Sequence, residues 1–262
     1  MTDPDAAALI AFAEELARVA RDETLPRFRT GLAADNKAGG GAFDPVTEAD
    51  REAERAIREA IAARYPGHAI RGEEWPDRRG EGPWCWSLDP VDGTRSFICG
   101  LPTWVTLIGC LNDERPMVGL IDAPVLGETY VGDGDAAWLV AGEARTRLSA
   151  SGCATLAEAR FSTTDPALFE GEARAALDRI ANRAKTVRYG HDGYAYARLA
   201  AGTLDLVVET GLKPFDYQAL IPVVRGAGGV FADWAGGDGF DGGRVIAAAT
   251  RELYEEARAL LA

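Results

Sequence analysis

The sequence is poor in sulfur and in histidine, and no apolar run in it approaches the roughly 20 residues that span a membrane. Its four cysteines, at positions 85, 99, 110 and 153, form no Cys-x-x-Cys pair. We therefore expect buried free thiols in a reducing compartment, which favours a cytoplasmic protein without a disulfide framework. The first residues include Asp3 and Asp5 and lack the basic region of a signal peptide, so a signal peptide is not predicted.

Basic residues are also scarce, with 28 Lys and Arg against 41 Asp and Glu and a net charge of −13. A nucleic-acid-binding surface needs a basic stripe, and none is visible, so nucleic acid is not an expected partner; neither is a membrane. A solvated surface explains most of this acidity, and carboxylates clustered around a metal would explain the remainder. Hydrophobic residues make up 47% of the chain, which is enough for one large domain or two lobes.

The first half of the chain predicts helices and an antiparallel sheet. Apolar residues at helical spacing predict a helix over residues 5–29, bent or ended near Pro26, and an amphipathic helix up to about Tyr65. Residues 36–41 are predicted to form a loop. Short β-rich runs separated by turn residues then predict an antiparallel meander, with strands at 104–111, 117–121, 128–131 and 137–140.

After residue 145 the pattern alternates between strands and helices. Strands are predicted at 159–162, 186–188, 205–208, 230–232 and 245–248, and helices at 170–182, 193–201, 214–227 and 250–261. A kink at Pro222 is the simplest way to accommodate a proline inside the third of these helices. The fold class is therefore α+β followed by α/β, with an antiparallel-sheet lobe at 1–145 and an α/β lobe at 146–262.

Residues 89–94 (DPVDGT) are the most informative segment. They follow an apolar run at 84–88 that predicts a buried strand, which Pro90 is expected to end. Asp89 and Asp92 can converge on one hard cation across the turn. Thr94 is placed to cap a helix whose first N–H groups would bind a phosphate oxygen. A cation site and a phosphate site on the same turn indicate metal-assisted phosphate chemistry.

Two other acidic motifs are excluded by spacing. A calcium-binding loop beginning at Asp89 would need oxygen ligands where Val91, Gly93 and Gly100 stand. Phosphatases that form an aspartyl phosphate have Asp-x-Asp-Gly-Thr, but Pro90 occupies the nucleophile's position. An isolated Asp-Gly is usually only a β-turn, so the argument depends on the rest of the chain.

Further acidic segments accompany this turn. Residues 72–74 (GEE) follow an apolar pair, residues 44–50 (DPVTEAD) lead into a helix, and residues 211–220 (GLKPFDYQAL) place Asp216 in a first helical turn. In this order and spacing, from about residue 10 to about 250, the motifs resemble the inositol monophosphatase superfamily of magnesium-dependent, lithium-sensitive phosphatases. The resemblance implies the layered sugar-phosphatase fold, with the site between the lobes, and a homodimer.

Three segments are similar in particular to the histidinol-phosphate phosphatases of that superfamily: residues 92–102 (DGTRSFICGLP), 189–196 (YGHDGYAY) and 212–216 (LKPFD). The second segment departs from the expected pattern, because His191 stands where Gly is expected and Gly193 where Cys is expected. Both flank Asp192, so these departures concern the substrate more than the type of reaction.

The resemblance implies ligands for two Mg²⁺ ions, with a third, weaker ion near Glu73. Glu73, Asp89 and the backbone carbonyl of Val91 would hold the first ion, and Asp89, Asp92 and Asp216 the second. Glu74 would contact these ligands without binding a metal ion itself. Unmetallated carboxylates raise one another's pKa, so some are expected to be protonated without metal.

The resemblance also implies direct attack of a water on phosphorus. Thr94 and Asp50, assisted by Glu73, would orient or deprotonate this water, although Asp50 also fits as an acid favoured by the helix dipole. The residues expected to bind the substrate are Asp92, Gly93, Thr94, Gly190, Asp192, Glu209 and Asp216.

The expected substrate is a small phosphate monoester. Asp192 and Glu209 would form an acidic wall opposite the metals, which favours a cationic ester such as histidinol phosphate. Inositol 1-phosphate, or a related sugar or nucleotide phosphate, is the alternative, and a catalytically silent binding relative is a further hypothesis. His68 is interpreted as a solvated turn residue, His191 as a pocket or turn residue, and Lys37 as a surface group or a neighbour of the ligands.

Overall fold

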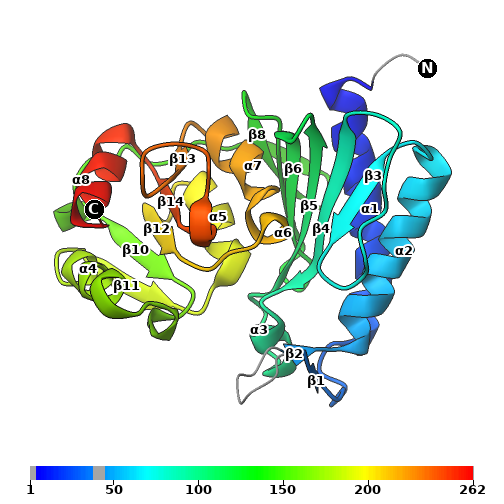
Figure 1. Ribbon diagram of the computed structural model, residues 1–262, viewed down its shortest axis with the longest axis horizontal. Helices are drawn as coiled ribbons and strands as arrows, with labels where there is room; N and C mark the ends of the chain where they lie inside the picture. Colours follow the sequence, from blue (N-terminus) through cyan, green and yellow to red (C-terminus); the bar gives the residue numbers. More distant parts are fainter. Residues whose placement is uncertain (1–3, 38–44, 262) are drawn as a thin grey trace.

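The computed structural model describes residues 4–37 and 45–261, which form five alternating layers of helix and sheet (Figure 1). Helices α1 and α2 cover one face of a seven-stranded sheet, and α5, α6 and α7 lie between this sheet and a five-stranded one. Helices α4 and α8 cover the far side of the second sheet. Separate clusters of buried apolar side chains fill the spaces between the layers, as amphipathic elements require.

The first sheet has the strand order β3-β4-β5-β6-β7-β8-β9, antiparallel except for β3 beside β4. The predicted meander is confirmed, with one additional strand, β9. Because β9 crosses position 145, the change of sheet comes slightly later than predicted. The elements up to β9 are α1 (Ala6–Thr24), η1 (Leu25–Arg27), β1 (Asp35–Asn36), β2 (Pro45–Val46), α2 (Glu48–Arg64), β3 (Ala69–Gly72), β4 (Trp84–Asp92), α3 (Thr94–Ile98), β5 (Val105–Asn112), β6 (Arg115–Ala123), β7 (Glu128–Gly132), β8 (Ala137–Ala141) and β9 (Ala144–Arg147).

The second sheet has the order β11-β10-β12-β14-β13, in which β10 runs parallel to both its neighbours. The alternation of strand and helix predicted from the sequence is confirmed. The remaining elements are η2 (Leu156–Glu158), β10 (Arg160–Thr163), η3 (Pro166–Leu168), α4 (Gly171–Ala181), β11 (Thr186–Tyr189), α5 (Asp192–Ala200), β12 (Leu206–Glu209), α6 (Pro214–Tyr217), α7 (Leu220–Gly226), β13 (Val230–Asp233), η4 (Asp241–Gly243), β14 (Val245–Ala248) and α8 (Arg251–Leu261).

Of the three expectations about prolines, the end of the first helix near Pro26 is confirmed, and the other two need correction. Helix α1 ends at Thr24, earlier than residue 29, and Pro26 lies in the η1 turn that follows. Strand β4 continues through Pro90, because three steps from Asp89 to Asp92 face only two steps on β5, and this bulge accommodates the proline. The predicted helix at 214–227 is two helices, α6 and α7. Pro222 lies in the first turn of α7, where no intrahelical N–H bond is lost, so no kink is needed.

Two other expectations were wrong in part. His68 is not a solvated turn residue: its ring stacks on Tyr65 at 4.5 Å between centroids and accepts a hydrogen bond from Trp86 Nε1 (3.1 Å). All four thiols are free, but only Cys85 and Cys110 are buried. Most of the predicted loop at 36–41 lies outside the described residues, and no described helix is both long enough and apolar enough to cross a membrane.

Candidate active site

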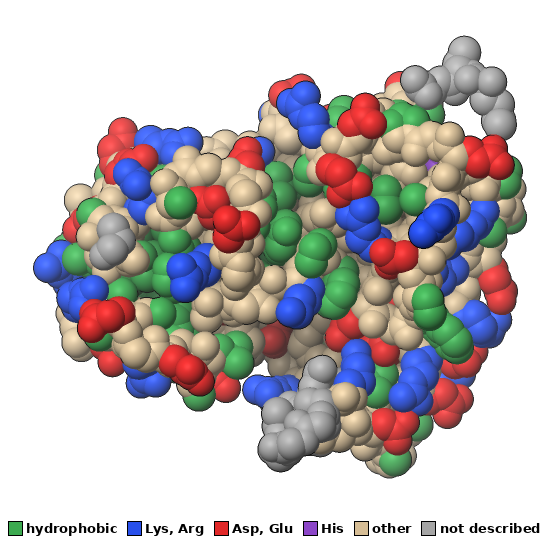
Figure 2. All heavy atoms as spheres, in the orientation of Figure 1, with side chains coloured by type: hydrophobic (Ala, Val, Ile, Leu, Met, Phe, Trp, Pro, Cys, Tyr) green, Lys and Arg blue, Asp and Glu red, His purple; other side chains and the backbone are tan. Residues whose placement is uncertain are grey.

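A cavity of about 360 Å³ lies between the two sheets and collects most of the predicted site residues. Figure 2 shows the molecule notched between its two halves, with acidic side chains visible in the notch. Asp50 and Gly190 do not line the cavity. The lining consists of Glu73, Asp89, Val91, Asp92, Gly93, Thr94, Arg95, Thr164, Leu168, Asp192, Gly193, Tyr196, Glu209, Thr210, Gly211, Leu212, Asp216 and Leu220.

The turn that follows β4 is held by its own polar groups. Asp89 Oδ1 accepts the N–H of Val91 (3.2 Å). Gly93 adopts a φ of 84°, and a Cβ there would lie 2.9 Å from Asp192 Oδ2, so both the conformation and the close approach require glycine. The expected capping role of Thr94 is wrong, because Gly93 is the N-cap residue and has no side chain to cap the helix.

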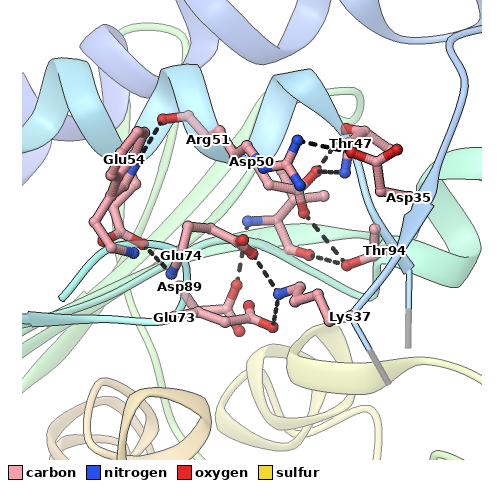
Figure 3. A network of polar contacts seen from close by, with 12 residues as sticks. Asp35, Lys37, Thr47, Asp50, Arg51, Glu54, Glu73, Glu74, Asp89 and Thr94 are labelled. Carbon is pink, nitrogen blue, oxygen red and sulfur yellow. Dashed lines mark hydrogen bonds and ion pairs between the residues drawn. The ribbon is translucent and has the colours of Figure 1, made fainter. Parts of the chain in front are cut away.

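The Thr94 hydroxyl is instead directed at Asp50. Thr94 Oγ1 donates to the carbonyl of Val91 (3.1 Å) and lies 3.4 Å from Asp50 Oδ1 (Figure 3). The other oxygen of Asp50 accepts the N–H and the hydroxyl of Thr47, which closes a capping box at the start of α2. Asp50 therefore caps the first turn of its helix with one oxygen and faces Thr94 with the other. Burial of this fully enclosed carboxyl is the main reason that its pKa is raised.

Lys37 joins the two glutamates that follow β3. Its Nζ donates to Glu73 Oε1 (2.7 Å) and to Glu74 Oε1 (2.6 Å), so Lys37 is a neighbour of the expected ligands and not a plain surface group (Figure 3). The side chain of Glu74 is 3% exposed, and burial raises its pKa to about 7. An ammonium therefore partly balances the charge of Glu73 and Glu74.

Asp89 and Asp92, at the end of β4, meet Asp216, from α6, in the cavity. Burial, followed by the charge of neighbouring carboxylates, raises the pKa of Asp89 and Asp92 well above its usual value, and burial raises that of Asp216 to about 7. The side chain of Asp216 is hydrogen-bonded to Asp89 and also accepts the N–H of Lys213 (2.6 Å). Asp92 Oδ2 accepts the N–H of Gly193. These buried acids repel one another unless protons or a cation intervene.

The donors present fit a hard divalent cation. The five residues expected to bind metal, Glu73, Asp89, Val91, Asp92 and Asp216, all line one cavity, offer only oxygen atoms and are short of positive charge. In their present arrangement, no three His, Cys, Asp or Glu side chains of residues 4–37 and 45–261 enclose a point that could hold an ion. Several of their oxygens instead accept N–H groups, including those of Lys37, Gly193 and Lys213.

The opposite wall of the cavity comes from the second sheet and α5. Asp192 begins α5 with a φ of 45°, and burial raises its pKa to about 6. Glu209, at the end of β12, accepts the Thr164 N–H (2.6 Å) and the Thr163 hydroxyl (3.1 Å), and burial raises its pKa to about 8. The predicted pair of carboxylates is therefore present on this wall, and both lack a cationic partner strong enough to hold the pKa down.

Two other residues expected in this region lie outside the lining. Gly190 adopts a φ of 81° at the turn before α5, which explains the glycine without a contact to substrate. His191 is the N-cap residue of α5, and its Nδ1 lies 3.3 Å from Ser162 Oγ, so it has a local role. Of the two interpretations of His191, the turn residue is the one that the structure supports.

Several cavity residues had no role in the sequence-based site, among them Arg95, Thr164, Leu168 and Tyr196. Arg95 NH1 lies 3.6 Å from Asp165 Oδ2, which joins the two halves at the cavity mouth. Tyr196 is 2% exposed, and its hydroxyl has no hydrogen-bond partner. The signal for Tyr196 was its position four residues after Asp192, which places it on the same face of α5. Nothing local in the sequence indicated Thr164 or Leu168.

Comparison with known proteins agrees with this fold and site. The model of the inositol monophosphatase family matches residues 5–262. The chain is 45% identical over 196 residues to the chloroplast bifunctional phosphatase IMPL2 of Arabidopsis thaliana, covering 74% of this chain but only 56% of that protein. It is 33% identical over 269 residues to a histidinol-phosphatase of Streptomyces coelicolor, covering 97% and 96% of the two chains.

A solved structure of an inositol monophosphatase from Zymomonas mobilis superposes on the chain with a TM-score of 0.85. The two are 38% identical, and the match covers 99% of each. The fold and the acidic cavity are those of a phosphatase. The chain belongs to the inositol monophosphatase family. Its relatives are named for both histidinol phosphate and inositol phosphate, so family membership alone leaves the substrate open.

Proposed function

We propose that this chain is a magnesium-dependent histidinol-phosphate phosphatase, which converts histidinol phosphate and water into histidinol and phosphate. The observation that carries the choice of substrate is the acidic wall formed by Asp192 and Glu209, two carboxyl groups that line the cavity. Burial raises the pKa of Asp192 to about 6, although the charge of Arg95 lowers it, and burial raises the pKa of Glu209 to about 8, so the positive charge at hand does not balance this wall. An ester with an amine at its far end would supply the missing charge. The name of the Streptomyces relative supports the same choice.

Two to three Mg²⁺ ions would be held by oxygen atoms of Glu73, Asp89, Asp92, Asp216 and the carbonyl of Val91. Bound there, magnesium would lower the pKa of a water and neutralise charge on the attacking and leaving oxygens. This role fits the shortage of positive charge around these buried acids.

The protein's own groups would orient the attack. The Thr94 hydroxyl, facing Asp50 at 3.4 Å, would accept a hydrogen bond from the attacking water and pass its own hydrogen to Asp50, with Glu73 assisting. The N–H groups of Gly93 and Thr94 would bind the phosphate. The water oxygen would form the new bond to phosphorus as the ester P–O bond breaks. The proton lost by this water would end on Asp50, and the departing alkoxide would take a proton from solvent water. No protein nucleophile is required.

The second candidate is hydrolysis of inositol 1-phosphate or a related sugar or nucleotide phosphate. The observation that favours it is the 38% identity to the Zymomonas protein, which is described as an inositol monophosphatase. As part of the proposal we also expect inhibition by lithium, a homodimer and a cytoplasmic location, all of which follow from the family resemblance and the free thiols.

The deciding experiment compares phosphate esters under one condition. The purified chain is assayed with histidinol phosphate, inositol 1-phosphate, fructose 1,6-bisphosphate and a nucleoside monophosphate, each with Mg²⁺ and with excess chelator. We expect the highest kcat/KM for histidinol phosphate and no turnover in chelator. A higher kcat/KM for inositol 1-phosphate would establish the second candidate, and full activity in chelator would contradict the metal mechanism. No turnover of any ester would support a silent binding relative.

A further inference from the structure

Glu54 is a buried carboxylate for which the proposed chemistry has no use. It lies in α2, one helical turn after Asp50, and is 0% exposed. A buried charge is costly unless it is paired and hydrogen-bonded. Glu54 Oε1 accepts Arg58 Nε at 2.7 Å, but this single ion pair leaves most of its hydrogen-bonding capacity for other groups.

The remaining capacity of Glu54 is taken by the backbone of the segment that carries Glu73. Glu54 Oε2 accepts the N–H of Glu74 (2.8 Å), and Oε1 accepts the N–H of Trp75 (3.2 Å). At Gly72 a Cβ would lie 2.2 Å from Glu54 Oε1, so the chain passes against this carboxylate with no room for a side chain. The backbone of residues 72–75 therefore runs along Glu54, and Figure 3 shows this carboxylate beside Glu74.

One face of α2 contacts both segments that carry proposed site residues, the turn after β4 and the segment after β3. Asp50 and Glu54 are four residues apart and therefore adjacent on α2. Asp50 faces Thr94 on the turn after β4, while Glu54 holds the segment after β3 (Figure 3). A helix is rigid over one turn, so the separation between these two carboxylates is fixed.

We propose that Glu54 is a positioning residue that fixes Glu73 relative to Asp50 and Thr94. It does so by binding the backbone N–H groups of the two residues that follow Glu73. Groups that hold a metal-binding residue in place typically contribute 10–100-fold to metal affinity. Loss of the hydrogen bonds from Glu54 should therefore weaken Mg²⁺ binding. The inference rests on the proposed function, since it assumes that Glu73 binds metal.

The test uses Glu54→Gln together with two matched variants. Glu54→Gln replaces one accepting oxygen by an NH₂ group, which cannot accept from a backbone N–H. Ile61→Val shortens a buried side chain of the same helix, so it reproduces a loss of stability without removing a hydrogen bond of the segment that follows Glu73. Glu59→Gln changes an exposed glutamate of the same helix, which pairs with Arg55, and controls for charge.

Two quantities are measured for each variant: the rise in Tm during a Mg²⁺ titration without substrate, and the Mg²⁺ concentration that gives half-maximal turnover. We expect both midpoints to rise 10–100-fold in Glu54→Gln and to change less than twofold in Ile61→Val and Glu59→Gln. Glu54→Asp, which keeps the charge but withdraws it from the N–H groups, should show the same shift and serves if Glu54→Gln does not fold.

Unchanged midpoints in Glu54→Gln and Glu54→Asp would overturn the inference, as would an equal shift in Ile61→Val, because the effect would then follow stability alone. Both results leave the proposed function intact, since the unmutated chain still responds to Mg²⁺. If the unmutated chain shows neither a Mg²⁺-dependent Tm nor Mg²⁺-dependent turnover, the proposed function and this inference are both wrong.

Discussion

At the scale of single residues, the cavity is defined by carboxyl groups whose surroundings oppose ionisation. Asp89 and Glu209 are buried and Asp92 is half-buried, and loss of solvation by burial is the largest cause of the raised pKa of each. Such strongly perturbed acids gathered in one cavity are typical of functional sites. Thr94 differs from them, because its role depends on the direction of one hydroxyl.

Replacing Thr94 by Ala should lower kcat by about 10²–10⁴-fold, as expected for loss of a group that moves or orients a proton. KM should change little, because the hydroxyl acts mainly in the transition state. Steady-state kinetics with the preferred ester measure both constants. Thr94→Ser keeps a hydroxyl and should retain most of the activity. A change confined to KM would assign Thr94 to substrate binding.

Replacing Asp192 by Asn should narrow the preference for histidinol phosphate over inositol 1-phosphate. A charge-assisted hydrogen bond contributes about 1.5–3 kcal/mol, so the ratio of kcat/KM values should fall roughly 10–150-fold, mainly through the amine-bearing ester. Asn also tolerates the left-handed φ of 45° at this position, so the backbone is not strained. Asp178→Asn, an exposed carboxylate on α4, is the control. An unchanged ratio would mean that Asp192 does not contact the amine.

At the scale of elements, α6 and α7 are held against the first sheet by unusually close backbone contacts. A Cβ at Gly119 of β6 would lie 1.9 Å from the carbonyl oxygen of Ala219, directly before α7. At Gly132 of β7 it would lie 2.6 Å from the carbonyl oxygen of Pro222. These approaches position α6, and with it Asp216, over the turn that carries Asp89.

Gly119→Ala should therefore destabilise the fold and also disturb the site. Forcing one methyl group against a backbone atom typically costs about 1–3 kcal/mol in the free energy of unfolding. Because the strain falls beside Asp216, the Mg²⁺ concentration for half-maximal turnover should rise as well. Chemical denaturation and a metal titration measure the two effects. Gly82→Ala, with nothing within 4 Å of its Cβ, should change neither. A variant as stable as the unmutated chain would show that α7 can move away at no cost.

At the scale of the whole molecule, the acidic cavity opposes folding at neutral pH. Glu209 has a pKa of about 8 in the folded state, against about 4.3 in an unfolded chain. Between these values the folded state binds more protons than the unfolded state, so the free energy of unfolding falls as pH rises. The acids with lowered pKa, Glu114, Asp205 and Asp233, titrate below about pH 4.5 and do not offset this fall.

In chelator, the free energy of unfolding should therefore decrease between pH 5 and pH 9. Glu209→Gln removes this titration while keeping an oxygen that can accept the Thr164 N–H, so its pH profile should be flatter. Denaturation series at each pH measure the slope. Asp238→Asn, an exposed acid paired with Arg225, should reproduce the unmutated slope. Equal slopes for all three proteins would show that Glu209 does not titrate in this range.

Local sequence patterns determined the elements and the type of chemistry. Alternating and helical spacings predicted both sheets and most helices, and residues 89–94 with Glu73 and Asp216 predicted an acidic phosphatase site. Such patterns succeed because the periodicity of a strand or helix and the chemistry of a turn depend on residues close together in the chain. Family resemblance added the layered fold, which the family comparison confirmed.

Tertiary structure decided what depends on distant contacts. The bulge that carries Pro90 depends on the register of β4 with β5, and the separation of α6 from α7 accompanies their close fit on Gly119. The pairing of Lys37 with Glu73 and the contact of Asp92 with Gly193 join residues 36 and 101 positions apart. No local pattern encodes these distances, because they arise only when both sheets pack against the helices between them.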